Sequence, residues 1–301
     1  MPRTLVTGAA GFTGHYVAEA LAAQGHEVHG LVHCQEELKQ PIPGFKQLHL
    51  GDLCDLDAVR RVTAEVQPDH VVHLAAIAFV AHGDVNEMYH VNVVGTRQLL
   101  QALSELPRMP SSILLASSAN IYGNVRQGVI DETVPPAPVN DYGVSKIAME
   151  YVGSIYREAL PLIIVRPFNY TGRGQSTNFI IPKIVEHARA KTKVIELGNL
   201  DVARDFSDVR TVADSYARLL LAPEAPGQTF NICSGAAVSL HQVLDLVMRL
   251  SGHHFEVTIN PAFVRPNEVR SLHGSRVRLE GVIGEVQSIA LEDTLRWMLN
   301  A

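Results

Sequence analysis

The sequence predicts an α/β fold, a doubly wound parallel sheet with a smaller C-terminal α/β lobe. Short, continuously apolar stretches alternate with amphipathic helical stretches over the first half of the chain. This alternation is typical of a parallel sheet that helices cover on both faces. A glycine-rich turn follows the first apolar stretch and precedes the first helical one. The alternation changes after Asn169, where the smaller lobe is expected to begin.

The first lobe is predicted to span residues 1–168, from hydrophobic periodicity and turn residues. Its strands are expected at 4–8, 26–32, 45–52, 70–76, 112–118 and 162–169, and its helices at 14–25, 56–66, 91–106 and 142–159. The second lobe is predicted over 169–301, with 209–232 returning to the first sheet. Its helices are expected at 179–191, 209–221 and 240–251, and its strands at 193–198, 229–235 and 255–260.

Composition and charge exclude several classes of function. The chain has 301 residues, 47% hydrophobic and 19% charged, as in ordinary globular proteins. A net charge of −6 offers no basic surface to nucleic acid, and no apolar run approaches the ~18 residues of a membrane span. The three cysteines form no C-x-x-C pair, so neither a disulfide framework nor a metal site is predicted. The N-terminal residues lack the apolar stretch of a signal peptide, and we expect a cytoplasmic protein.

Three glycines, Gly8, Gly11 and Gly14, lie between the first strand and the first helix. A tight turn needs a residue without a Cβ, a pyrophosphate binds bare N–H groups at a helix N-terminus, and the helix must pack closely on the sheet. The flanking strand and helix therefore indicate a dinucleotide-binding turn of the Rossmann type. The spacing is G-x-x-G-x-x-G rather than G-x-G-x-x-G.

The end of the second strand bears on which nicotinamide dinucleotide is bound. An Asp at this point favours NAD, because it accepts hydrogen bonds from the adenosine ribose. This chain has Val32 and His33 there, so no carboxylate repels a 2′-phosphate and His33 could help to neutralise one. The sequence therefore favours NADP, while Glu36 and Glu37 keep NAD open.

Tyr142 and Lys146 are four residues apart at the start of a predicted helix and so share one face. Ser117 and Ser118 end the preceding strand at the carboxyl edge of the sheet, where ligands bind in such folds. The pKa of a free tyrosine, ~10, is too high for acid–base work at neutral pH. We expect the lysine cation and an oxidised nicotinamide to lower it. Tyr142 could then exchange a proton with a carbonyl or alcohol oxygen that Ser118 holds, while hydride passes to or from the nicotinamide.

These motifs together resemble the extended short-chain dehydrogenase/reductases of the nucleotide-sugar epimerase/dehydratase group. The resemblance covers nearly the whole chain and rests on VTGAAGFTG, GDLCD, HLAA, NVVGT, SSANIYG, YGVSK, RPFNYTGRGQ and RDFSDV. It implies Ser118, Tyr142 and Lys146 as catalytic residues, with Asn92 supporting them. VIELGNLDVARDFSDVRTVADSY resembles the branch that acts on GDP-mannose derivatives, which implies a GDP-sugar substrate.

The same resemblance implies the residues that contact the two ligands. For the cofactor these are Gly8, Gly11, Phe12, Thr13, Gly14, His33, Asp52, Leu53, Ala75, Ala76, Tyr142, Lys146, Pro167 and Phe168, with Asp52 and Leu53 at the adenine. For the substrate they are Asn169, Asn178, Arg204, Arg265 and Glu268. The two arginines would clamp the diphosphate, because a guanidinium presents a fork of donors, and Glu268 would accept from ribose hydroxyls.

Departures from the family pattern narrow the predicted reaction. Members that dehydrate at C4 and C6 carry an acidic pair just after the catalytic serine or threonine, where this chain has Ala119 and Asn120. GDP-fucose synthases epimerise with a cysteine and a histidine, and those positions are Asn120 and Gly174 here. We therefore expect the simplest remaining chemistry, an NAD(P)H-dependent reduction of the C4 ketone of GDP-4-keto-6-deoxy-D-mannose to GDP-D-rhamnose.

Two other functions stay open. A nucleotide-sugar 4-epimerase uses the same catalytic residues and keeps its NAD tightly bound, whereas a reductase exchanges its cofactor. A non-catalytic nicotinamide-binding regulator is the third hypothesis, although such proteins often lose the tyrosine or lysine that this chain retains. Helices 91–106 and 142–159 have broad apolar stripes. In the family these two helices often pair between subunits, which implies a homodimer.

Overall fold

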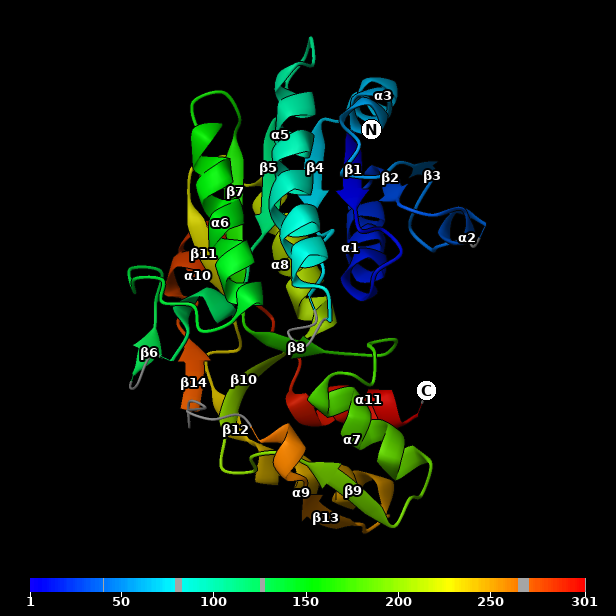
Figure 1. Cartoon of the computed structure of the whole chain (residues 1–301), viewed down its shortest axis with the longest axis vertical. Coiled ribbons are helices and arrows are strands. Elements are labelled where there is room, and N and C mark those ends of the chain that lie inside the picture. The colour runs from blue at the N-terminus through cyan, green and yellow to red at the C-terminus, as the bar shows by residue number, and fades with distance from the viewer. Residues whose placement is uncertain (40, 79–82, 125–127, 265–270, 301) are drawn as a thin grey trace.

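The computed structural model describes residues 1–39, 41–78, 83–124, 128–264 and 271–300. Within them, seven parallel strands form the main sheet, in the spatial order β3-β2-β1-β4-β5-β7-β11 (Figure 1). They are β1 (Arg3–Thr7), β2 (Glu27–Val32), β3 (Gln47–Leu50), β4 (His70–His73), β5 (Ser112–Ala116), β7 (Leu162–Pro167) and β11 (Thr229–Ile232). The direction of winding reverses between β1 and β4, so the carboxyl ends of these strands form a switch point where ligands bind in such folds.

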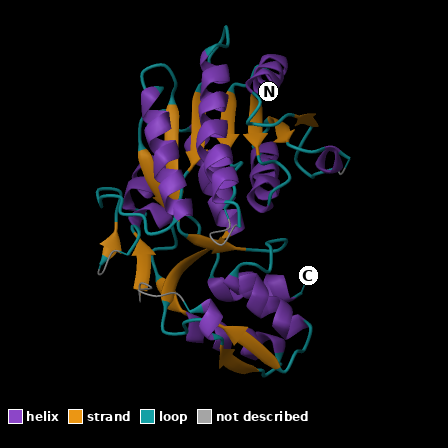
Figure 2. Ribbon diagram, viewed as in Figure 1, coloured by secondary structure: helices purple, strands orange, loops and turns teal. Residues whose placement is uncertain are grey.

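Helices cover both faces of the main sheet (Figure 2). One face carries α1 (Phe12–Ala23), α8 (Val209–Leu221) and α10 (Val277–Ile283), and the other carries α3 (Leu56–Val66), α5 (Thr96–Ser104) and α6 (Asp141–Ile155). Successive side chains of a strand point to opposite faces, so Val6 packs with α1 and α8 while Leu5 packs with α3 and α5. Burial on both faces makes the strands continuously apolar. The predicted fold class is confirmed.

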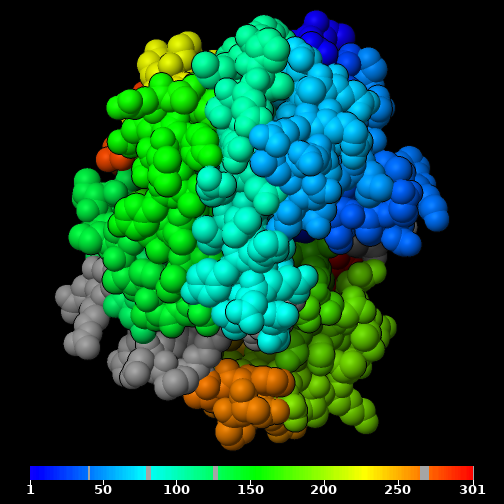
Figure 3. All heavy atoms as spheres, turned by 45° about the horizontal axis from the view of Figure 1, so that its top comes forward, coloured from blue at the N-terminus to red at the C-terminus, as the bar shows by residue number. Residues whose placement is uncertain are grey.

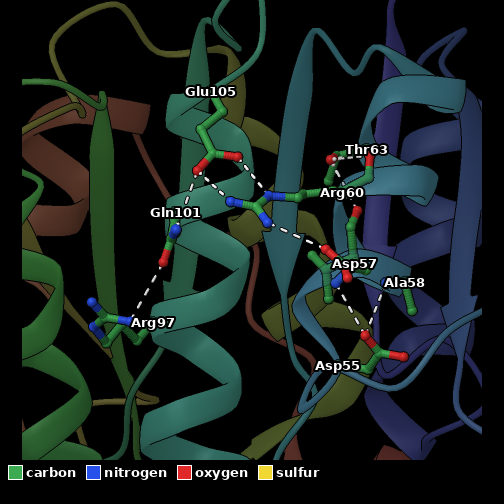
Figure 4. A network of polar contacts seen from close by, with 9 residues as sticks. Asp55, Asp57, Ala58, Arg60, Thr63, Arg97, Gln101 and Glu105 are labelled. Carbon is green, nitrogen blue, oxygen red and sulfur yellow. Dashed lines mark hydrogen bonds and ion pairs between the residues drawn. The ribbon is translucent and has the colours of Figure 1, made fainter.

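Polar side chains also join α3 to α5 (Figure 4). Arg60 donates to both carboxylate oxygens of Glu105, at 2.8 and 2.9 Å, and to Asp57 at 3.2 Å. Glu105 also accepts from Gln101 at 3.2 Å. Asp55 caps α3 by accepting from two backbone N–H groups of its first turn. Exposed ion pairs contribute little to the free energy of folding, so the buried apolar contacts are what hold α3 against α5.

The second lobe is built on smaller sheets and one helical layer. Its described strands are β12 (Ala237–Ser239), β10 (Ala203–Asp208), β14 (Ser271–Gly274) and β6 (Val129–Ile130) in that spatial order, with β8 (Asn169–Thr171) also paired to β10, and β9 (Val194–Leu197) paired to β13 (Glu256–Ile259). The helices α7 (Ile180–Arg189), α9 (Leu240–Ser251) and α11 (Leu291–Leu299) pack around one apolar core. The carboxyl ends of β1 and β4 point toward this lobe (Figure 1).

Predicted element bounds agree with the structure in some places and not in others. Helices α3, α8 and α9 begin and end at the predicted residues. The helix expected at 91–106 instead begins as α4 (Val85–Tyr89), passes through a π-helical turn, η1 (His90–Gly95), and continues as α5. Residues 209–232 form α8 and β11 of the main sheet.

The predicted division of the chain at residue 168 stays a prediction, and two segments cross it. β6 pairs with β14 of the second lobe, and α10 packs on the main sheet next to β11. The remaining described helical segments are short: α2 (Gln35–Leu38), η2 (Ala119–Tyr122) and η3 (Pro261–Phe263). Among the residues that the structure describes, no helix has the length and apolar character that crossing a membrane requires.

Candidate active site

The glycine-rich turn joins β1 to α1 at the switch point of the sheet. Gly8 has a φ of +68°, and a Cβ on it would lie 2.8 Å from the backbone nitrogen of Ala75. A Cβ on Gly14 would lie 2.6 Å from the carbonyl oxygens of Gly8 and Ala9. Gly11 is the N-cap of α1 and supplies no side-chain cap. The turn therefore requires glycine, and the first N–H groups of α1 lack intrahelical acceptors, as an anion-binding turn requires.

Phe12 and Thr13 begin α1, and both contact Tyr170 of β8. Thr13 Oγ1 and the Tyr170 hydroxyl oxygen lie 2.8 Å apart. The rings of Phe12 and Tyr170 stack, with their centroids 6.1 Å apart. The predicted cofactor turn is thereby tied to the second lobe through Tyr170, a residue that sequence analysis did not identify because nothing in the pattern links positions so distant in the chain.

Ser118, Tyr142 and Lys146 lie together at the carboxyl edge of the sheet. Ser118 follows β5 and accepts hydrogen bonds from the backbone N–H and the side-chain amide of Asn120, at 3.1 and 3.2 Å. Its hydroxyl proton is therefore available to Tyr142, with which Ser118 shares a side-chain hydrogen bond. Lys146 Nζ donates to the carbonyl oxygen of Ala116 at 2.8 Å. The structure thus brings the three predicted catalytic side chains into one cluster.

The pKa of Tyr142 differs from the expectation of a lowered value. Burial raises the pKa of Tyr142 above that of an ordinary tyrosine, and the hydrogen bond with Ser118 partly offsets this effect. Lys146 Nζ lies 5.9 Å from the centroid of the Tyr142 ring, and its hydrogen bond goes to Ala116 instead. In the protein alone, desolvation of a phenolate therefore outweighs the cation. Tyr142 is protonated at neutral pH, which is the form that can donate a proton.

Asn92 connects the loop after β4 to the catalytic helix. It lies in the π-helical turn η1, and such turns are frequent at functional sites. Asn92 Oδ1 accepts from the backbone N–H of Ile77 at 2.8 Å, and Nδ2 donates to the hydroxyl of Ser145 at 3.0 Å. The Ser145 hydroxyl in turn donates to the carbonyl of Tyr142 at 2.8 Å. This network links Asn92 to the backbone of Tyr142, and its supporting role stays a prediction.

His73 is buried at the end of β4, and its hydrogen bonds fix its tautomer. Thr96 Oγ1 donates to the carbonyl of Asn92, so the His73 Nε2 atom 2.9 Å away must be the donor to Thr96. His73 Nδ1 then accepts from Thr7 of β1 at 2.7 Å. Burial lowers the pKa of His73 to about 3, with the charge of Lys146 acting in the same direction. The ring is therefore neutral, and its two hydrogen bonds connect β1 to α5.

At the end of β2, His33 contacts a carboxylate. His33 Nδ1 lies 3.1 Å from Glu37 Oε2, which also accepts from the backbone N–H of His33 at 3.1 Å. Potential ligand atoms of His33, Cys34 and Glu37 all lie within 4.8 Å of one another. We assign no metal to them, because the imidazole and the carboxylate already satisfy each other at an exposed turn. Of the two glutamates that keep NAD open in the sequence, Glu37 is the one that contacts His33. The preference for NADP stays a prediction.

The other residues predicted to contact the cofactor end or follow strands of the main sheet. They are Asp52 and Leu53 after β3, Ala75 and Ala76 after β4, and Pro167 and Phe168 at and after the end of β7. Asp52 is exposed and accepts from the backbone N–H of Cys54 at 2.8 Å. The Leu53 side chain is buried in the core with α3 and α5. All six lie at the edge where the prediction placed them, and their roles stay predictions.

The residues predicted to contact the substrate belong to the second lobe. Asn169 begins β8, and Asn178 precedes α7; both are exposed. Arg204 lies half-buried in β10, where its guanidinium donates to the carbonyl of Ala203 at 2.9 Å. Arg265 and Glu268 lie outside the described residues. The contacts of all five with a substrate stay predictions.

Two buried hydroxyl groups of the described chain have no hydrogen-bond partner. They are the Oγ of Ser117, directly before Ser118, and the hydroxyl of Tyr216 in α8, which lies near Tyr142 and Tyr170. An unpaired buried hydroxyl costs about 1–3 kcal/mol, and a polar ligand group bound beside these atoms would offset that cost. The ribose hydroxyls and carboxamide of a nicotinamide dinucleotide fit this requirement. Sequence analysis identified Ser117 only as a neighbour of Ser118 and did not identify Tyr216.

Comparison with known proteins supports the resemblance found in the motifs. A model of the GDP-mannose 4,6 dehydratase family matches residues 5–298. The chain is 34% identical over 282 residues to the GDP-6-deoxy-D-talose 4-dehydrogenase of Aggregatibacter actinomycetemcomitans, covering 94% of this chain and 91% of that protein. It is 33% identical over 309 residues to the GDP-6-deoxy-D-mannose reductase of Pseudomonas aeruginosa, covering 99% of this chain and 96% of that protein.

A solved structure shows the same fold with a cofactor bound. It is RMD from Pseudomonas aeruginosa complexed with NADPH, which superposes with a TM-score of 0.85 at 32% identity and covers 100% of this chain and 97% of that one. The resemblance to the nucleotide-sugar epimerase/dehydratase group is therefore confirmed.

Proposed function

Because the chain belongs to the GDP-mannose 4,6-dehydratase family and its relatives are NAD(P)-dependent enzymes of GDP-sugars, we propose that it reduces the C4 ketone of GDP-4-keto-6-deoxy-D-mannose to GDP-D-rhamnose, which is GDP-6-deoxy-D-mannose. One observation carries the proposal. The Ser118–Tyr142–Lys146 cluster is complete, yet the position next to Ser118 that is acidic in dehydratases holds Asn120, whose N–H groups bind the Ser118 oxygen.

In the proposed mechanism Tyr142 is the general acid. The glycine turn would hold the diphosphate of a nicotinamide dinucleotide, which would supply hydride chemistry at C4 when bound. Tyr142, which burial keeps protonated, donates its proton to the ketone oxygen as charge develops there. When substrate binds, the single hydroxyl proton of Ser118 turns from Tyr142 to the same ketone oxygen, while the Ser118 oxygen keeps accepting from Asn120. The Lys146 ammonium stabilises the phenolate that remains until solvent reprotonates it.

Asn120 argues against dehydration at the same site. Elimination of water across C5 and C6 needs a group that removes a proton and one that delivers it. A carboxamide does neither, and Ala119 beside it has no polar side chain. The redox step at C4 alone needs no further acid or base beyond Tyr142, so the residues present suffice for reduction and not for dehydration.

The test is product analysis with GDP-4-keto-6-deoxy-D-mannose and NADPH or NADH. We expect oxidation of the cofactor in step with loss of ketone, and an NMR spectrum of the product that matches GDP-6-deoxy-D-mannose. The talose 4-dehydrogenase relative favours a second candidate, in which hydride reaches the opposite face of C4 and GDP-6-deoxy-D-talose is formed. A purified protein that retains stoichiometric NAD and oxidises no added cofactor would contradict a reductase and support the 4-epimerase.

We propose that Glu37 sets the preference between NADPH and NADH. The sequence favours NADP, and RMD was solved with NADPH, but the Glu37 carboxylate lies beside His33 where a 2′-phosphate would approach. We propose that NADPH and NADH are therefore both accepted. Glu37→Gln is expected to raise the NADPH-to-NADH ratio of kcat/KM about fivefold, since a charge pair at 4 Å in water is worth about 1 kcal/mol.

The matched control is Glu36→Gln, which removes the same charge from an exposed neighbouring side chain for which no contact with His33 is found. Its cofactor ratio should stay close to that of the unsubstituted enzyme. A Glu37→Gln enzyme whose ratio is unchanged, or falls, would show that this carboxylate does not act on the adenosine phosphate.

We also propose that the enzyme is a homodimer, as the family resemblance implies. Helices α5 and α6 lie side by side at the surface, where their outer faces are visible as adjoining bands (Figure 3). On α6, Tyr151 is 65% exposed and Ile155 is 76% exposed. Large apolar side chains at a helix surface are typical of protein–protein contacts, and a second copy of this chain is the partner that the resemblance implies.

A further inference from the structure

A buried carboxylate lies one helical turn beyond Lys146. Glu150 is four residues further along α6, so the two side chains share a face of the helix. Lys146 is 4% exposed and Glu150 is 7% exposed. Glu150 accepts two hydrogen bonds from Arg166 of β7, Nε to Oε1 at 3.0 Å and Nη2 to Oε2 at 2.7 Å. The carboxylate that Arg166 pairs therefore lies one helical turn from Lys146, in the buried part of α6.

Arg166 is itself fixed from its other side. Its Nη1 donates to the Tyr122 hydroxyl at 3.0 Å, and its guanidinium lies 5.2 Å from the centroid of the Tyr122 ring. The Tyr122 hydroxyl donates to Asn231 of β11 at 2.7 Å. Each of these side chains is buried. The network therefore holds the Glu150 carboxylate in one position.

Apart from the Glu150–Arg166 ion pair, the described titratable side chains that lie near Lys146 carry no charge. On β4, burial lowers the pKa of His73 to about 3, so its ring is neutral. On α6, burial raises the pKa of Tyr142, so its hydroxyl is neutral. β5 contributes only the carbonyl oxygen of Ala116. Burial lowers the pKa of Lys146 to about 8, and Glu150 is the group whose charge raises it.

We propose that Glu150, clamped by Arg166, is a positioning residue that keeps the Lys146 ammonium charged in the pH range where the enzyme works. A desolvated ammonium loses its proton readily unless a nearby negative charge compensates it. The proposal rests on the proposed function in one respect, because the ammonium matters through the phenolate that it stabilises. A pair that only held α6 against β7 would affect stability, not the protonation of Lys146.

Two substitutions separate charge from shape. Glu150→Gln keeps the shape and removes the charge, whereas Glu150→Asp keeps the charge and shortens the side chain. The protonation of Lys146 is measured in the protein without substrate, by competitive labelling with acetic anhydride and mass spectrometry of the labelled peptide. The labelling covers about pH 6 to 10, which brackets the pKa expected for a buried lysine amine. The pH profile of kcat for ketone reduction is the second measurement.

For Glu150→Gln we expect the labelling midpoint of Lys146 and the alkaline limb of the kcat profile both to move down by about one pH unit. For Glu150→Asp both should stay near the unsubstituted values, even where stability falls. If Glu150→Gln does not fold, the double variant Glu150→Gln/Arg166→Gln, which leaves no unpaired charge in the interior, is measured in its place. Both midpoints should then move down by less than one pH unit but still measurably, because the Arg166 cation is removed together with the carboxylate.

An unmoved labelling midpoint in Glu150→Gln overturns the inference, whatever the substrate proves to be. Equal shifts in Glu150→Gln and Glu150→Asp also overturn it, because shape rather than charge would then be the cause. Absence of ketone reduction by the unsubstituted protein would overturn the proposed function instead, and the labelling result would still decide whether Glu150 controls the protonation of Lys146.

Discussion

Tyr142→Phe is expected to lower kcat for ketone reduction by about 10²–10⁴-fold, the usual contribution of a positioned general acid. The side chain is buried, and its ring keeps the same packing when only the hydroxyl is removed. Packing should therefore be retained, and the main loss should appear in kcat, with a smaller change in cofactor affinity because Tyr142 is also predicted to contact the cofactor. Steady-state rates from cofactor absorbance, together with a cofactor titration by fluorescence, separate the two effects.

The matched control for this substitution is Tyr151→Phe on the same helix. Tyr151 is 65% exposed on the outer face of α6, so the same hydroxyl is removed far from the cluster, and kcat should be retained. A Tyr142→Phe enzyme with a kcat within a few-fold of the unsubstituted value would mean that the ketone oxygen takes its proton from another donor. That result would contradict the proposed mechanism.

Gly8→Ala is expected to weaken binding of the nicotinamide dinucleotide at least tenfold and to destabilise the protein. An added Cβ would meet the backbone nitrogen of Ala75 at 2.8 Å and its Cα at 2.9 Å. Backbone atoms cannot rotate away, so the glycine turn or the end of β4 must shift. Overpacking lowers the free energy of unfolding by about 1–3 kcal/mol. The left-handed backbone conformation of a residue with a Cβ costs about 1–2 kcal/mol more. Isothermal titration and thermal unfolding measure the two consequences.

Gly25→Ala is the control, because it shares the backbone cost without the contact. Gly25 has a φ of +84°, and nothing lies within 4 Å of the Cβ that would be added. It follows α1 at the end remote from the cofactor turn. We expect a modest loss of stability and unchanged cofactor affinity. Equal affinities in the two variants would show that the close approach of Gly8 to Ala75 does not position the turn.

Helices α3 and α9 match their predicted bounds to the residue, and two independent signals coincide in each. Helix α3 combines an apolar stripe with the cap at Asp55, and α9 combines one with a capping box at Ser239. The strand β14 carries no such signal: it has four residues and pairs with β10 and β6, far away in the chain. Its existence depends on tertiary contacts rather than on local preference. Helix α11 does show a periodic apolar face and could have been predicted.

The candidate catalytic cluster could be predicted from its motifs, but its electrostatics could not. The sequence indicates that Tyr142 and Lys146 share a helix face, and the pKa of each then depends on burial, which only the fold determines. The ion pair behind them did leave a signal in the sequence. Arg166 interrupts a continuously apolar strand, and a charge buried in a sheet needs a partner. Glu150, at helical spacing from Lys146, meets that need.

Three elements that follow residue 168 in the chain, α8, β11 and α10, belong to the main sheet and its helical cover. They limit where the polypeptide can be divided into fragments. A fragment ending at residue 168 would leave the β7 edge without β11, and the face that α8 and α10 bury would be open to water. An unpaired, apolar edge of this kind invites aggregation. A stand-alone fragment or a chimaera built on the glycine turn would therefore have to carry α8, β11 and α10 as well, and exchanging the second lobe between relatives requires several junctions rather than one.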